Sequence, residues 1–128
     1  MLAEALSRDI LPHMTQTDVQ KYLADIQIAY LRIQEFTQGQ TIEDYRDDVR
    51  TQAAVERQFE IIGEAVSQMI QAVPEMERAL SDASKIVAFR DYLLHGYASV
   101  SYKMVWGFLE GSLPRLIREV EAMLAEAN

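Results

Sequence analysis

The residues best suited to chemistry in this sequence lie together in the segment 89–97, which reads FRDYLLHGY. It places an arginine, Arg90, five residues before a histidine, His95. An imidazole can take the proton of an RNA 2′-hydroxyl, and a guanidinium can hold a phosphate through two hydrogen bonds while negative charge develops. The two side chains are therefore sufficient in kind to cleave RNA without a metal ion.

The same segment also has a purely structural interpretation. Arg90 would pair with a surface carboxylate, and His95 would stabilise the C-terminus of a helix through the helix dipole. Tyr92 and Tyr97 would pack in the core. Residue spacing leaves both interpretations open.

Composition excludes several other kinds of chemistry. There is no cysteine, so disulfides, thiol catalysis and thiolate metal sites are excluded. Two histidines, His13 and His95, are too few for a multi-histidine metal site within one chain. The sequence contains no GxxxxGK(S/T), GxGxxG, GxSxG or HExxH motif. A net charge of -8 opposes broad phosphate binding, so any site for a polyanion must be small and local.

Helical periodicity dominates the sequence, since glycine, proline and alternating β-branched runs are scarce. We therefore predict one all-α domain over residues 15–128, a bundle of four to five helices, with residues 1–14 as an extension outside the fold. Apolar spacing and breaking residues predict helices at about 17–36, 50–72, 84–96 and 101–125, with a short helical turn at 41–48. Pro114 should divide the last helix into two segments in near continuation.

Two glycines and the two site residues predict how the helices pack and where the site residues lie around their helix. Gly63 inside the second long helix predicts close packing of a neighbouring helix, and Gly96 predicts a left-handed C-cap. At about 100° per residue, Arg90 and His95 lie about 140° apart around a helix. A single chain presents them poorly as a pair. A two-fold dimer that joins two such helix ends would put both residue types in one cleft.

The segment RDYLLHGY fits the pattern R-x4-H-x-Y. Together with YLADIQIAYLRIQEF, TQAAVERQFEIIGEAV and MVWGFLEGSLPRLIREVEAML, it resembles the HepT-like toxins of the HEPN superfamily. The resemblance spans about residues 17–124. It implies a homodimeric α-helical bundle with a composite cleft, and metal-independent endoribonuclease activity against RNA as the toxin of a toxin-antitoxin system.

The resemblance also assigns roles to residues and a partner. It implies that Arg90 and His95 are catalytic and that an MntA-like minimal nucleotidyltransferase antitoxin transfers AMP to Tyr97. ATP and magnesium would serve that partner, and this chain would need no cofactor of its own. Asp91 follows the arginine at a position where the family often has asparagine. Its carboxylate could orient Arg90 or weaken phosphate binding.

No apolar run approaches the roughly 18 residues that a membrane span needs, and the N-terminus lacks the pattern of a signal peptide, so we expect a cytoplasmic protein. Trp106 is expected in helix packing. Glu60 and Glu64 lie one turn apart and could reach the cleft, but sequence assigns them no role.

The acidic charge favours an alternative function, a non-catalytic helical module that binds a nucleotide, RNA or a partner protein.

Overall fold

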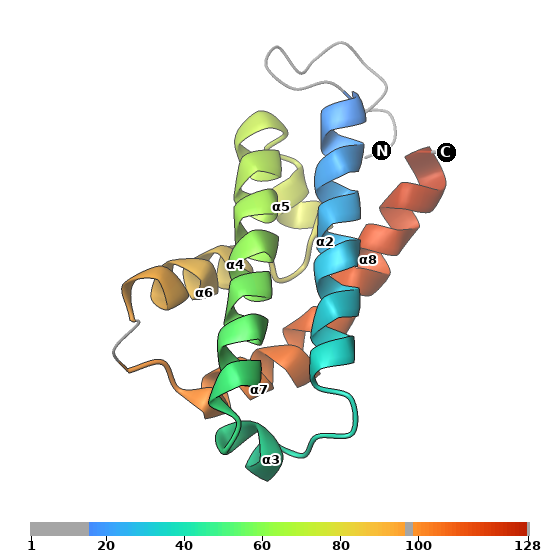
Figure 1. Ribbon diagram of the computed structural model, residues 1–128. Coiled ribbons are helices and arrows are strands. Elements are labelled where there is room, and N and C mark those ends of the chain that lie inside the picture. Colours follow the sequence, from blue (N-terminus) through green and yellow to red (C-terminus); the bar gives the residue numbers. More distant parts are fainter. Residues whose placement is uncertain (1–15, 97–98, 128) are drawn as a thin grey trace.

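The computed structural model describes residues 16–96 and 99–127, and this part of the chain is all-α with no strand. The predicted extension at 1–14 lies outside the described residues. Five helices have nine residues or more and two are shorter, in the order α2 (Gln16–Phe36), α3 (Ile42–Arg46), α4 (Val49–Ala72), α5 (Met76–Ala79), α6 (Ala83–His95), α7 (Tyr102–Glu110) and α8 (Ser112–Ala127) (Figure 1). The predicted all-α class is confirmed, whereas α5 had no sequence prediction.

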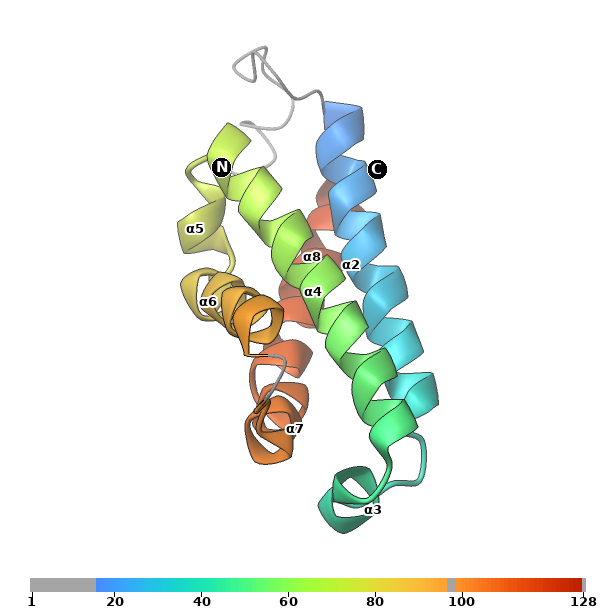
Figure 2. The same cartoon turned by 60° about the vertical axis from the view of Figure 1, so that its left-hand side comes forward.

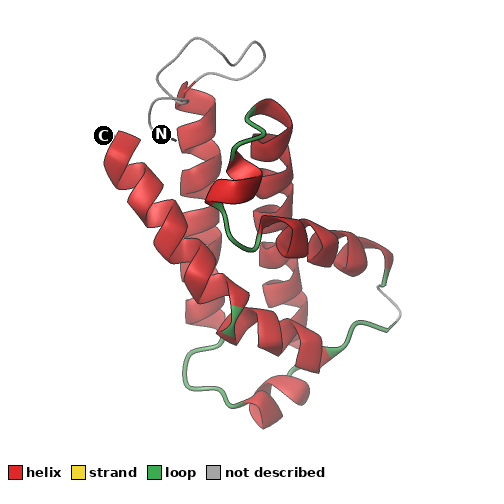
Figure 3. Ribbon diagram, turned by 180° about the vertical axis from the view of Figure 1, so that it is seen from behind, coloured by secondary structure: helices red, strands yellow, loops and turns green. Residues whose placement is uncertain are grey.

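The centre of the bundle is the pair α2 and α4, which lie side by side and run in opposite directions (Figures 1 and 2). Val19, Leu23, Ile26 and Ile33 of α2 are fully buried. Their spacing of three, four and seven residues places them on one face of the helix. Seen from behind, α8 lies in front of α2 and crosses it at an angle (Figure 3). The helix α2 is thus covered by α4 and by α8.

The helix that carries the candidate site, α6, packs on α4 and projects from the central pair (Figures 1 and 2). A Cβ atom added to Gly63 of α4 would lie 2.7 Å from Cγ of Arg90 and 3.4 Å from the Ile86 carbonyl oxygen. Only a residue without a side chain permits so close an approach. The close packing predicted from Gly63 is confirmed.

Each end of α6 is tied to the fold in its own way. Just before its first residue, the buried carboxylate of Asp82 accepts two hydrogen bonds of 2.9 Å from Nη1 of Arg115 in α8. At its end, the Gly96 N–H donates to the Tyr92 carbonyl at 2.7 Å. The expectation of a left-handed cap at Gly96 is wrong, because its φ is -99°. The glycine serves close approach instead, since an added Cβ would lie 2.7 Å from that carbonyl oxygen.

The C-terminal half closes the lower end of the bundle. Trp106 of α7 is buried, and its ring lies 5.3 Å from that of Tyr45 in α3, as the packing role predicted. Gly111 separates α7 from α8, and Pro114 is the third residue of α8, where the missing N–H removes no helical hydrogen bond. The predicted break is confirmed. None of the helices between residues 16 and 127 is both long and apolar enough to cross a membrane.

Candidate functional site

The site is positioned by the aromatic side chain that precedes Arg90. Phe89 is buried and stacks on Phe108 of α7 with ring centroids 4.0 Å apart. It also meets Phe59 of α4 edge to face at 5.2 Å. These contacts join three helices at one side chain and set the rotation of α6. The next residue, Arg90, is thereby directed toward α4.

Arg90 lies between two carboxylates. Its stem packs over Gly63, and most of the side chain is buried. Nη1 donates to Glu64 of α4, and Nε donates to Oδ1 of Asp91 at 2.9 Å. A guanidinium has five N–H donors, so three remain for a phosphate. Locally, one positive charge faces two negative ones.

The imidazole of His95 is exposed in the last turn of α6. Its Nδ1 lies 2.8 Å from the Asp91 carbonyl oxygen. A carbonyl oxygen can only accept, so Nδ1 must donate the hydrogen. In the neutral ring this leaves the lone pair on Nε2, which is the tautomer that a general base requires.

Asp91 links the two candidate catalytic residues. Its side chain accepts from Arg90 and its backbone carbonyl accepts from His95. The hydrogen bond to Nε is the contact that an orienting role for Asp91 requires. Contacts typical of the structural interpretation are also present, because Arg90 does pair with carboxylates and His95 does bond a helix carbonyl. The geometry is compatible with both interpretations.

Tyr92 anchors the chain that follows α6. Its hydroxyl accepts from the Ser101 N–H at 2.8 Å and donates to the Ser99 carbonyl at 3.4 Å. Its ring stacks beside Phe89 with centroids 6.1 Å apart. The predicted modification residue, Tyr97, lies outside the described residues.

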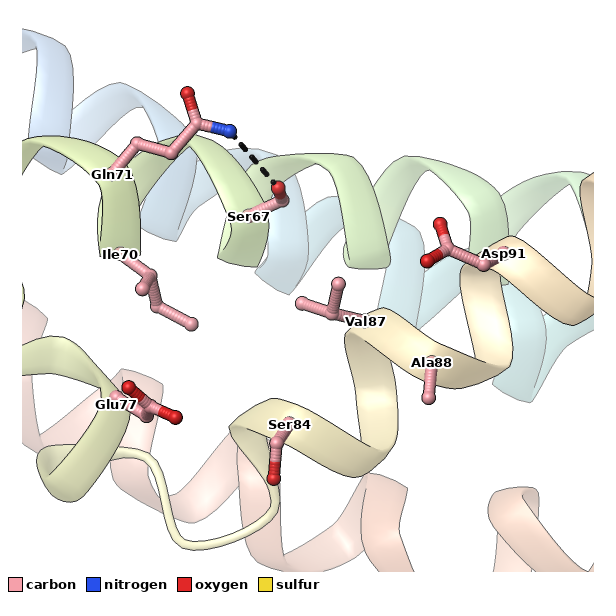
Figure 4. A pocket seen from close by; sticks show the side chains of 8 residues that line it. All are labelled: Ser67, Ile70, Gln71, Glu77, Ser84, Val87, Ala88 and Asp91. Atoms are coloured by element: carbon pink, nitrogen blue, oxygen red, sulfur yellow. Dashed lines mark hydrogen bonds between the residues drawn. The ribbon is translucent and has the colours of Figure 1, made fainter.

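A pocket opens beside the site, between α4, α5 and α6, with a volume of about 320 Å³. Figure 4 shows Ile70 of α4 and Val87 of α6 pointing into it and Asp91 at one end. Ser67, Gln71, Glu77, Ser84 and Ala88 complete its lining. No sequence pattern indicates this pocket, since its walls come from three helices that meet only in the folded chain.

Sequence reasoning considered Glu64 without assigning it and did not consider Gln68. Nε2 of Gln68 donates to Oε1 of Glu64 at 3.0 Å, four residues away on α4. That spacing is visible in the sequence, because residues four apart meet on a helix surface. The contact from Glu64 to Arg90 spans 26 positions and is not visible there. Within the described ranges, no three His, Asp or Glu side chains are grouped so that they could hold a metal ion.

Comparison with known proteins assigns the family. The model for the family described as "Ribonuclease HepT-like" matches residues 26–123, and the chain belongs to this family. A relative from Methanocaldococcus jannaschii with a provisional RNase name is 30% identical over 117 residues, covering 88% of this chain and 93% of the relative. A Thermococcus cleftensis protein, provisionally named ribonuclease HepT, is 32% identical over 102 residues, covering 80% and 92%. No solved structure matches the chain.

Proposed function

We propose that this protein is the toxin of a toxin-antitoxin pair and that it cleaves RNA without a metal ion. The observation that carries the proposal is the shared anchoring of Arg90 and His95 on Asp91. Among the described residues, Nε2 of the imidazole and three guanidinium donors have no further partner. Family membership and the RNase names of the relatives support the same activity.

The reaction follows from these two side chains. His95 takes the proton of a 2′-hydroxyl, and the 2′-oxygen attacks the adjacent phosphorus. The bond from phosphorus to the 5′-oxygen breaks, and that oxygen takes a proton from a water molecule, whose hydroxide takes the proton back from the His95 imidazolium. Arg90 stabilises the charge on the phosphate oxygens. The products are a 2′,3′-cyclic phosphate and a 5′-hydroxyl.

We further propose that a homodimer forms the complete cleft. Arg90 is held against α4, whereas His95 is exposed at the helix end, about 140° further around the axis, so we expect a second chain to complete the cleft. The exposed Leu94, which lies between them, supplies apolar surface for such a contact. A stable interface would bury at least about 1,000 Å² in total. Light scattering at micromolar concentration checks this, and a monomer there would contradict the composite cleft.

The deciding experiment compares wild type, His95→Ala and Arg90→Lys on a synthetic RNA in EDTA. Loss of a positioned base should reduce cleavage by about 10² to 10⁴. Arg90→Lys should also fail, because lysine retains the charge but lacks the planar fork of donors. A matched RNA with a single 2′-deoxy nucleotide at the cleavage position should resist the wild type. Cleavage that survives in His95→Ala, or that EDTA abolishes, would contradict the mechanism.

Regulation by AMP transfer to Tyr97 is the second part of the proposal. A phosphodiester on this tyrosine would add about one negative charge two residues from His95, where substrate phosphate must bind. Intact-mass spectrometry after incubation with an MntA-like nucleotidyltransferase, ATP and magnesium checks it. We expect the wild type and the control Tyr92→Phe to gain AMP and Tyr97→Phe to gain none. Equal modification of Tyr97→Phe would exclude Tyr97 as acceptor.

The alternative function, a non-catalytic binding module, is favoured by one observation. Glu64 and Asp91 give the surroundings of Arg90 a net negative charge, which opposes the binding of RNA phosphate. Such a module would bind RNA or nucleotide equally well in wild type and His95→Ala and would leave the RNA intact. Total-RNA integrity and growth after expression of the two variants separate the alternatives.

A further inference from the structure

A chain of hydrogen bonds on α4 ends at Arg90. Gln68 donates to Oε1 of Glu64, and Oε2 of the same carboxylate accepts from Nη1 of Arg90. The two oxygens of Glu64 thus have different partners. Because Gln68 lies one turn further along the same helix, it fixes the plane of the carboxylate that Arg90 meets.

The stem of Arg90 is held on the same helix. Gly63 precedes Glu64, and the first two side-chain carbons of Arg90 lie over it so closely that an added Cβ would overlap them. An unconstrained arginine side chain samples many rotamers, so its donors have no fixed direction. Here α4 confines the stem through Gly63 and the head through Glu64. Asp91 on α6 holds the opposite side of the guanidinium.

We propose that Glu64 is a positioning residue that aims Arg90 at the scissile phosphate, with Gln68 as its support. This inference rests on the proposed ribonuclease function. Glu64 does not touch the substrate in this scheme. It uses one of the five guanidinium donors, Asp91 uses a second, and the other three stay available in a fixed direction.

A carboxylate that positions Arg90 and a carboxylate that competes with the substrate phosphate for Arg90 predict different kinetics. A carboxylate that merely occupied the phosphate site would lower kcat/KM, and any substitution would raise activity. A positioning carboxylate raises kcat because it holds the donors where charge develops, while its own negative charge weakens RNA binding and raises KM. The negative charge of Glu64 therefore raises KM, whereas its positioning of Arg90 raises kcat. Two substitutions of Glu64 separate these two effects.

The experiment compares Glu64→Gln with Glu64→Ala on one RNA substrate. Glutamine keeps an oxygen that accepts from Arg90 and loses the charge, and its NH2 group can donate to the Gln68 amide oxygen once the Gln68 amide flips. We therefore expect kcat within about threefold of wild type and a lower KM. Alanine loses both hydrogen bonds, and kcat should fall about 10- to 100-fold. Glu60 is the matched control, one turn earlier on α4 and paired with Arg57. Glu60→Gln and Glu60→Ala should leave kcat unchanged.

A rise of kcat/KM in both Glu64 variants would show a competitor and overturn the proposal, as would a wild-type kcat in Glu64→Ala. A second measurement needs no cleavage. The NMR signal of the Arg90 Nη1–H that faces Glu64, assigned with Arg90→Lys, should be sharp in wild type and Glu64→Gln and exchange faster with water in Glu64→Ala. An unchanged signal in Glu64→Ala would refute the anchoring. If the wild type cleaves no RNA, the proposed function fails, and this signal still tests the anchoring by itself.

Discussion

Ion pairs are found toward both ends of α6, but the buried partner is the anion at the start of the helix and the cation toward its end. At its start, the carboxylate of Asp82 is buried, with 6% of the side chain exposed, while its partner Arg115 is 48% exposed. At its end, Arg90 is 18% exposed, whereas its partners Glu64 and Asp91 are 52% and 54% exposed. One end buries the anion, and the other end shelters the cation.

The difference in burial gives the two groups of ion pairs different roles, one in stability and the other in function. A buried carboxylate that loses its cation is left as an uncompensated charge, so the Asp82 pair stabilises the attachment of α6 to α8. Half-exposed carboxylates are already hydrated and contribute little to stability. Around Arg90 they orient the guanidinium, whose other three donors face no carboxylate among the described residues. Burial, more than the pairing itself, therefore decides what each ion pair does.

The largest expected effect comes from Arg115→Ala at the buried-anion end. It leaves Asp82 without its partner and should lower the free energy of unfolding by about 3 kcal/mol. Urea unfolding followed by circular dichroism measures it. Arg118→Ala, an exposed arginine on the same helix, is the control and should change it by less than about 0.5 kcal/mol. RNA cleavage per folded molecule should be unchanged, and a loss of cleavage without unfolding would break the comparison.

The second-largest expected effect is on both the free energy of unfolding and RNA cleavage. Gly63→Ala should lower the free energy of unfolding by about 1 to 3 kcal/mol, because the new Cβ overlaps the root of Arg90 and forces α4 and α6 apart. It should also reduce cleavage, since the same shift takes Arg90 away from Glu64. Gly107→Ala is the matched control. A Cβ there meets nothing within 4 Å, so this helical position should gain up to about 1 kcal/mol.

If Gly63→Ala is as stable and as active as wild type, α6 does not depend on close approach to α4. That outcome would contradict the placement of Arg90 by α4. Loss of stability with full cleavage would confine the role of Gly63 to packing.

The smallest expected effect concerns pH and a fourth carboxylate, away from both ends of α6. Asp48 caps α4, and hydrogen bonds from the side chain and backbone of Thr51 and the side chain of Gln40 lower its pKa. Its folded pKa is below the unfolded value, so its charge stabilises the fold above about pH 4 and this stabilisation is lost as the pH falls through the folded pKa. Asp48→Asn should lower the Tm slightly at pH 7.

The difference in Tm between Asp48→Asn and wild type should vanish in strong acid. Thermal unfolding between pH 7 and pH 2 measures it, with the exposed Glu75→Gln as a control for the loss of one charge. A constant offset over the whole range would mean that hydrogen-bond geometry, and not charge, carries the effect. Cleavage at neutral pH should not change, which keeps this cap distinct from the site.

Much of the fold follows from local patterns. Buried positions recur every three or four residues in α2 and α4, and such spacing depends only on the helical period, so both helices were predicted to within one residue. Gly63 and Pro114 were also interpreted correctly, because each residue type has few roles inside or at the start of a helix. Gly96 was not, since a glycine after a helix serves either a left-handed turn or a close contact, and sequence does not distinguish them.

The all-α class, the family and the order of Arg90, Asp91, His95 and Tyr97 follow from the sequence alone, because they depend on residue types and short spacings. Which carboxylates meet Arg90, and how deeply each is buried, depends on the tertiary structure. Glu64 reaches Arg90 only because α6 crosses α4 at Gly63, and Asp82 is buried only because Arg115 arrives from α8. Such contacts depend on how helices cross, and a crossing is set by the packing of the whole bundle, not by any one segment.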